Sequence, residues 1–121
     1  MPQTTSINHV ALHTADLTRS VQFYAQIMQF EQLPRPAFDF DGAWFKLGTV
    51  QELHLIAGRQ IAVMSGSRSN HFALEVPDLD EWHKYLTTHK TTFKPPKTRP
   101  DGLRQIFIED PDGYMIELLG R

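Results

Sequence analysis

The sequence predicts an α+β fold built from two tandem strand-helix-three-strand (βαβββ) modules in 121 residues. The first observation is a repeat: Asn8-His9-Val10-Ala11-Leu12 recurs 62 residues later as Asn70-His71-Phe72-Ala73-Leu74. Both copies then lead to an Asp-Leu pair, at 16–17 and 78–79. The second observation is size, because 121 residues suffice for one ordinary core but not for two independent ones. We therefore expect a single domain over 1–121, with modules at about 5–57 and 69–120 whose curved sheets surround a shared cavity.

Composition limits the classes of partner. Hydrophobic residues make up 40% of the chain, the formal net charge is −2, and the sequence pI is about 6.3. Because the charges are scattered, we expect neither nucleic acid nor a membrane as partner. The absence of cysteine excludes disulfides, thiolate ligands and a cysteine nucleophile. With no basic, apolar leader and no run of about 18 apolar residues, we expect a soluble, cytoplasmic protein.

The first module begins with an alternating strand and a capped helix. From Ile7 to Thr14 apolar side chains occupy alternate positions, which predicts a strand with His9 on the face away from the helix. Asp16 can cap the helix that follows. Apolar residues at helical spacing extend this helix to about Met28.

Three extended segments complete the first module. Pro34 and Pro36 bracket a loop or an edge strand, because proline cannot donate to a ladder. Residues 43–47 and 52–56 read as strands joined by a turn at 48–51. Residues 58–68 read as the connection between the modules, with one short extended patch.

The second module repeats this order. We expect a strand at 70–76, then a helix capped by Asp78 with Glu81 in capping-box position, ending near His89. Residues 105–109 and 114–119 flank Asp-Pro-Asp-Gly at 110–113, which is a strong hairpin signal.

Polar side chains interrupt the last strand of each module at equivalent places. His54 lies between Leu53 and Leu55, and 63 residues later Glu117 lies between Ile116 and Leu118. Alternation places both on the face opposite the helices, together with His9 and His71. Three imidazoles and one carboxylate suit a divalent transition metal, so we predict a metal site formed by His9, His54, His71 and Glu117.

These motifs resemble the vicinal oxygen chelate superfamily, which includes glyoxalase I, extradiol dioxygenases, methylmalonyl-CoA epimerase, fosfomycin-modifying enzymes and bleomycin-binding proteins. The resemblance covers essentially the whole chain and rests on the two Asn-His motifs and on residues 16–24 and 110–118. It implies that His9, His71 and Glu117 occupy metal-binding positions. His54 stands where glyoxalase I-like proteins have a glutamate and the epimerases a glutamine.

The resemblance implies a glyoxalase I-like lyase or isomerase that acts on a small substrate with adjacent oxygens, using Ni, Co, Zn, Fe or Mn. Glu117 would be the proton shuttle, and His54 either a fourth ligand or a base. One alternative is an extradiol-type dioxygenase that holds iron with His9, His71 and Glu117. Another is a non-catalytic, bleomycin resistance-like protein that binds an antibiotic.

The resemblance also implies a homodimer with shared active sites. His9 and His54 would come from one chain, and His71 and Glu117 from its partner. Two-fold pairing would also cover exposed sheet edges. The alternative is pairing of the two modules within one chain, which the connection at 58–68 can permit.

Several other residues have open roles. Trp44 and Phe107, equivalent at the 63-residue offset, are expected on the ligand face, where they either stack on a substrate or fill the core. A proline-rich segment carries four basic residues that either lie in a solvated loop, which we favour, or hold a carboxylate or phosphate: Lys94, Lys97, Arg99 and Arg104. We expect His13, His83 and His89 either at the surface or beside the predicted metal ligands, without binding the metal themselves.

Overall fold

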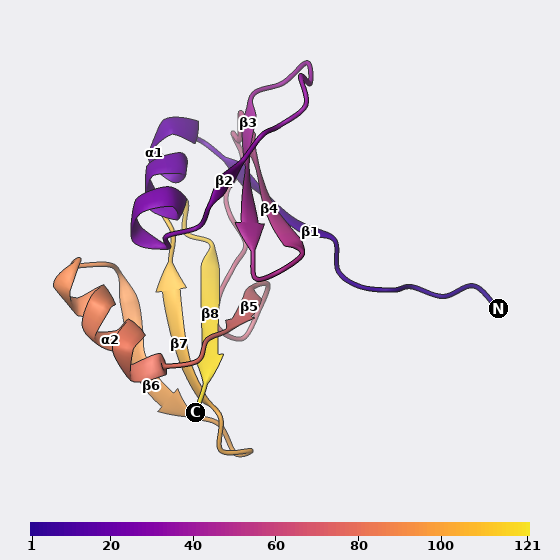
Figure 1. The fold of residues 1–121 in the computed structure, drawn as a ribbon. Coiled ribbons are helices and arrows are strands. Elements are labelled where there is room, and N and C mark those ends of the chain that lie inside the picture. Colours follow the sequence, from indigo (N-terminus) through magenta and orange to yellow (C-terminus); the bar gives the residue numbers. More distant parts are fainter. The chain divides into compact units, whose positions relative to one another are not determined.

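The computed structural model describes all residues, 1–121, and divides into two compact units, Met1–Ile61 and Ala62–Arg121 (Figure 1). Each unit contains the predicted strand, helix and three further strands, so the α+β class and the duplicated module are confirmed. The boundary falls inside the segment predicted as the connection. No helix in the chain has the length and apolar character needed to cross a membrane.

The first unit is a four-stranded mixed sheet with one helical segment on one face. Its strand order is β1-β4-β3-β2, with β1 parallel to β4 and the other pairs antiparallel. The elements are β1 (His9–Thr14), α1 (Leu17–Gln22), η1 (Phe23–Ile27), β2 (Gln32–Leu33), β3 (Gly42–Leu47) and β4 (Gln51–Ala57). The two-residue edge strand β2 ends immediately before Pro34, as expected of a proline-bounded edge.

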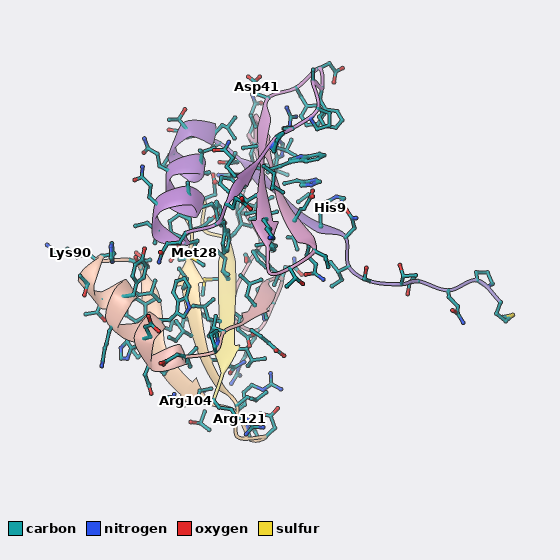
Figure 2. All side chains as sticks on the ribbon, viewed as in Figure 1. His9, Met28, Asp41, Lys90, Arg104 and Arg121 are labelled. Atoms are coloured by element: carbon teal, nitrogen blue, oxygen red, sulfur yellow. The ribbon has the colours of Figure 1, made fainter.

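Alternation along the strands separates the core of the first unit from its polar face. Phe45, Leu53 and Leu55 point to the helical side and are at most 1% exposed. Tyr24 and Met28 of the helical segment meet them there as buried residues. The side chain of His9 lies on the opposite face of the sheet from α1 (Figure 2). The predicted facing of this strand is therefore confirmed.

The helical segment of the first unit begins and ends where the sequence predicts. Asp16 is the N-cap, and its side chain accepts a hydrogen bond from the backbone N–H of Arg19 at 3.1 Å. After Gln22 the helix widens into the π-helical turn η1, whose last bond runs from the N–H of Met28 to the carbonyl of Phe23 at 3.0 Å.

The second unit has the same topology, with strand order β5-β8-β7-β6. Its elements are β5 (Phe72–Glu75), α2 (Leu79–Thr88), β6 (Phe93–Thr98), β7 (Arg104–Glu109) and β8 (Met115–Gly120). Asp78 caps α2 by accepting from the N–H of Glu81 at 3.0 Å. The apolar core consists of residues at most 1% exposed: Leu79, Leu86, Ile106, Ile108, Ile116 and Leu118.

The predicted hairpin turn joins β7 and β8. The carboxylate of Asp110 is buried and accepts from the backbone N–H groups of Asp112 and Tyr114, both at 2.9 Å. Gly113 has a φ of 94°, a left-handed conformation that glycine adopts without strain. Side chain and backbone therefore fix the register of the two strands that carry Phe107 and Glu117.

Two expectations from the sequence are wrong. The proline-rich segment favoured as a solvated loop is the edge strand β6, which pairs with β7 around a register shift between Lys94 and Lys97. Prolines are tolerated there because an edge strand at a bulge leaves backbone N–H positions unused. The extended patch expected at 58–68 is absent, since no strand forms between β4 and β5.

Candidate functional site

In the first unit, three rings from neighbouring strands stack on the polar face of the sheet. The ring of His54 lies 4.1 Å from that of Trp44 with an interplanar angle of 3°, and 4.1 Å from that of His9 at 15°. Strand register explains the stack, because His54 pairs with Trp44 on one side and with Ala11 on the other, two residues after His9. The stack holds the two predicted ligands of this unit side by side.

Hydrogen bonds orient both imidazoles of this stack. Nδ1 of His9 lies 2.8 Å from Oδ1 of Asn8, so the nitrogen donates and Nε2 carries the lone pair of the neutral ring. Nε2 of His54 lies 2.9 Å from a carboxylate oxygen of Glu52 and donates to it. Nε2 of His9 can therefore bind a metal ion through its lone pair, whereas Nε2 of His54 is already hydrogen-bonded to a carboxylate.

In the second unit, His71 and Glu117 meet directly. Nε2 of His71 lies 3.1 Å from Oε1 of Glu117, and the amide of Gln105 donates to Oε2 of the same carboxylate at 3.1 Å. The side chain of Glu117 is only 6% exposed. A buried carboxylate requires such partners, because losing water without replacing its hydrogen bonds is costly.

The proton on His71 can be placed from its other nitrogen. Nδ1 lies 3.0 Å from the carbonyl oxygens of both Gly66 and Ser69, which only accept, so Nδ1 carries a proton. In the neutral ring Nε2 then presents its lone pair to Oε1 of Glu117. Two electron-rich atoms at this distance need a positive group between them, either a proton or a metal ion. Histidines that bind a metal ion usually donate their other ring N–H to a carbonyl or carboxylate oxygen in this way.

The turn that orients His71, at 65–69, overlaps the end of the segment predicted as a connection, 58–68. Ser65 accepts a hydrogen bond at its Oγ from the N–H of Met115 at 2.9 Å and donates to the carbonyl of Asn70 at 2.6 Å. Gly66 donates its N–H to the same carbonyl at 3.2 Å. The turn at 65–69 is thus anchored to strand β8, and its carbonyls from Gly66 and Ser69 accept from the imidazole of His71.

The two units place their predicted ligands at equivalent positions. Glu117 pairs with Phe107 and with Ala73, two residues after His71, just as His54 pairs with Trp44 and Ala11. Phe107 meets the ring of His71 edge-on, at 5.3 Å between centroids. Neither Trp44 nor Phe107 is among the fully buried core residues.

Each unit thus brings together two of the four predicted ligands. Within either unit, no group of three or more histidine and acidic side chains is arranged to hold a metal ion. The donor chemistry nevertheless fits a divalent ion, since Nε2 of His9 and Nε2 of His71 each carry a lone pair in the neutral ring and Glu117 adds an anionic oxygen. The assignment of these residues as ligands stays a prediction.

Sequence reasoning missed the residues that orient the predicted ligands. Glu52 and Gln105 each lie two positions from a residue already identified, on the same strand face, so alternation was the signal that could have found them. The turn at 65–69 has no periodic signal, because its role depends on backbone carbonyls.

Two of the histidines that were not predicted as ligands have contacts within the second unit. The ring of His83 contacts Phe93, and His89 forms a hydrogen bond with the carbonyl of Tyr85.

Comparison with known proteins identifies the family. The model of the Glyoxalase/Bleomycin resistance protein/Dioxygenase superfamily matches residues 6–118. "Glyoxylase I 4" of Arabidopsis thaliana is 26% identical over 94% of this chain and 70% of its own length. "Metallothiol transferase FosB" of Staphylococcus saprophyticus is 25% identical over 93% of this chain and 75% of its own length.

A solved structure gives the same result for the fold. The crystal structure of a glyoxalase family protein from Bacillus anthracis, described as putative, superposes with a TM-score of 0.84 at 24% identity, covering 100% of this chain and 99% of the other. The duplicated βαβββ topology and the match over nearly the entire sequence lead to one conclusion: the chain belongs to the Glyoxalase/Bleomycin resistance protein/Dioxygenase superfamily.

Proposed function

We propose that this protein is a divalent-metal-dependent enzyme of the glyoxalase I type, a lyase or isomerase acting on a small substrate with two adjacent oxygens. The observation that carries the proposal is the contact of Nε2 of His71 with Oε1 of Glu117 at 3.1 Å. Backbone carbonyls fix the proton of His71 on Nδ1, so this pair presents a nitrogen lone pair and a carboxylate oxygen to a cation.

His9, His71 and Glu117 would hold the ion, and when bound it supplies a Lewis acid for a pair of adjacent substrate oxygens. A set with two imidazoles favours Ni, Co, Zn, Fe or Mn over Mg or Ca, which prefer oxygen ligands. The relatives named glyoxylase and metallothiol transferase support metal chemistry on this scaffold.

Glu117 has the surroundings of a proton-transfer group. Its carboxylate takes a proton from one substrate carbon and returns it to the neighbouring carbon. The amide of Gln105 fixes one carboxylate oxygen, and the small exposed fraction of 6% limits competing water. A ligand that also shuttles a proton would account for the conversion of one carbonyl isomer into another.

His54 is either a fourth ligand or a base, and its bond to Glu52 favours the base. A carboxylate on Nε2 holds the ring proton on that nitrogen and leaves the lone pair of Nδ1 available to accept a proton. This arrangement leaves three protein ligands for the metal and keeps a second titratable group beside His9.

A second candidate is metal-dependent transfer of a thiol to a small substrate. It is favoured by the similarity to FosB at 25% identity over 93% of this chain. The two candidates share the metal and differ in the bond that changes: isomerisation moves a proton between adjacent carbons of the substrate, whereas thiol transfer joins a free thiol to the substrate. Iron-dependent ring cleavage and binding of an antibiotic without turnover are the remaining alternatives, and neither predicts turnover of a hemithioacetal.

The assay measures turnover of the hemithioacetal formed from methylglyoxal and a thiol, with chelator-treated and metal-reconstituted protein. We expect metal-dependent isomerisation that Glu117→Gln lowers by about 100-fold or more, as loss of a general base does. His54→Ala should keep the metal affinity of the unaltered protein, whereas His54→Glu should keep the metal and raise isomerase activity. Equal turnover with and without metal would contradict the proposal. Loss of the metal in His54→Ala would instead identify His54 as a ligand.

A further inference from the structure

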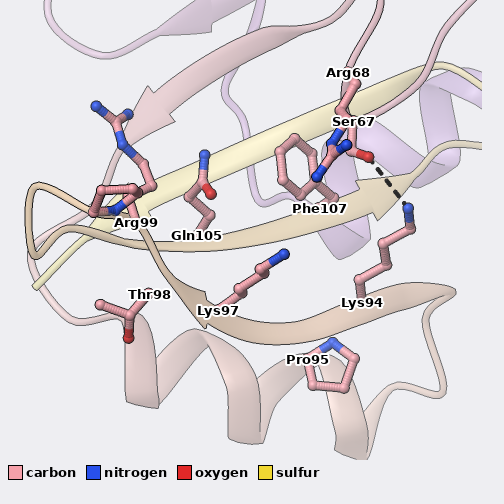
Figure 3. A pocket seen from close by; sticks show the side chains of 10 residues that line it. Ser67, Arg68, Lys94, Pro95, Lys97, Thr98, Arg99, Gln105 and Phe107 are labelled. Atoms are coloured by element: carbon pink, nitrogen blue, oxygen red, sulfur yellow. Dashed lines mark hydrogen bonds between the residues drawn. The ribbon is translucent and has the colours of Figure 1, made fainter.

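The second unit contains a pocket of about 320 Å³ whose basic residues come from β6, its following loop and the turn before β5 (Figure 3). No carboxylate lines this pocket. The ammonium groups of Lys94 and Lys97 extend from β6 toward the side on which Phe107 and Arg68 lie (Figure 3). The basic lining residues are Arg68, Lys94, Lys97 and Arg99.

Most of this positive charge is not neutralised by the protein. Arg99 is paired with Asp101, at 2.5 and 3.2 Å, and this guanidinium holds the pKa of the Asp101 carboxyl below its usual value. Lys94 donates only to the neutral hydroxyl of Ser67, at 3.4 Å. The side chains of Arg68 and Lys97 form no hydrogen bond or ion pair with the protein. Three cations thus share one concave surface on a chain whose net charge is −2.

Arg104, grouped with these residues by sequence, is not part of the pocket. Its guanidinium donates to Asp80 at 2.9 Å and to the carbonyl of Arg121 at 3.0 Å. The hydrogen bond and charge of Arg104 lower the pKa of Asp80, and the same contact raises the pKa of Arg104. Arg68, which lies three residues before His71, contributes to the pocket instead.

The pocket adjoins the predicted metal ligands through two shared side chains. Gln105 lines the pocket and donates to Oε2 of Glu117 at 3.1 Å. Phe107 also lines the pocket, and its ring meets that of His71 at 5.3 Å. A group bound here is therefore separated from Glu117 and His71 by a single layer of side chains.

We propose that this pocket binds the anionic end of the substrate, a phosphate or phosphonate group, through Arg68, Lys94 and Lys97. Clustered cations without counter-ions repel one another, and a small dianion relieves that repulsion while accepting several charge-assisted hydrogen bonds. A volume of about 320 Å³ suits a small molecule, at the lower end of ligand pockets. Assigning the anion to the substrate rests on the proposed function, whereas anion binding itself does not.

The test is calorimetric titration of chelator-treated full-length protein with inorganic phosphate, and with acetate in a parallel arm. We expect phosphate to bind and Arg68→Gln and Lys97→Gln each to weaken its binding about tenfold or more, because a hydrogen bond to a charged group is lost. Both residues are exposed, so the variants should fold. Lys84→Gln, an exposed lysine of α2 outside the pocket, should bind phosphate like the unaltered protein.

Absence of phosphate binding, or equal affinity in the two pocket variants and the unaltered protein, would overturn the inference. Acetate binding as tight as that of phosphate would overturn the choice of a tetrahedral dianion. Metal titration of the same preparations keeps the two proposals apart. Intact metal binding without phosphate binding refutes only the anion pocket, and phosphate binding without metal binding refutes only the metal enzyme.

Discussion

Replacing Glu117 with alanine is expected to weaken binding of a divalent transition metal by about 100-fold or more. Loss of a residue that only hydrogen-bonds to a metal ligand costs about 10–100-fold in metal affinity, so loss of an anionic ligand itself should cost at least the upper end of that range. The change also leaves Nε2 of His71 and the amide of Gln105 without their carboxylate partner. The measurement is competitive titration of Ni²⁺, Co²⁺ and Zn²⁺ against a chromophoric chelator.

A matched control lies on the adjacent strand. Glu109 is an exposed carboxylate of β7, so Glu109→Ala removes the same charge without touching the His71–Glu117 contact. We expect its metal affinity to equal that of the unaltered protein. If Glu117→Ala and Glu109→Ala bind metal with the same affinity, Glu117 is not a ligand.

The second large effect is recovery of tight metal binding when two defective chains are mixed. We propose a homodimer in which His9 of one chain acts with His71 and Glu117 of its partner. After subunit exchange between His9→Ala and Glu117→Ala chains, half of the dimers are mixed, and each mixed dimer has one site with no substitution. About a quarter of all sites should therefore bind metal tightly.

Pairing of the two units within one chain predicts the opposite result. Every site would then keep one substitution, and the mixture would bind metal no better than either variant alone. Mixed dimers must be demonstrated independently, for example by native mass spectrometry of chains that carry different tags. Tight metal binding by the His9→Ala or Glu117→Ala protein alone, without mixing, would show that the substitution does not impair the metal site.

Most of the fold could be predicted because local signals agree with the duplicated topology. Asp16 and Asp78 cap helices as the sequence indicates, and the turn at 110–113 forms around Asp110. Strand β6 was missed because consecutive prolines normally argue against a strand. Only its edge position and the register shift after Lys94 make them compatible with pairing.

The candidate site was predicted only where its residues lie on strands, because strand alternation is visible in the sequence and the geometry of an irregular turn is not. Alternation correctly placed His9 on the polar sheet face and Glu117 within reach of His71. The carbonyls of Gly66 and Ser69 that fix the proton of His71 belong to an irregular turn, whose geometry no periodic pattern encodes. Arg68 was missed because its place beside β6 depends on that same turn.

The most direct test of the metal assignment is X-ray absorption spectroscopy of the unaltered protein reconstituted with Zn²⁺, combined with elemental analysis. We expect one ion per chain, nitrogen and oxygen ligands at about 2.0–2.2 Å, and the multiple-scattering signal of two imidazoles, which falls to one in His71→Ala. Substoichiometric zinc, or a first shell of oxygen alone that is unchanged in His71→Ala, would contradict the assignment of His9, His71 and Glu117 as the metal ligands.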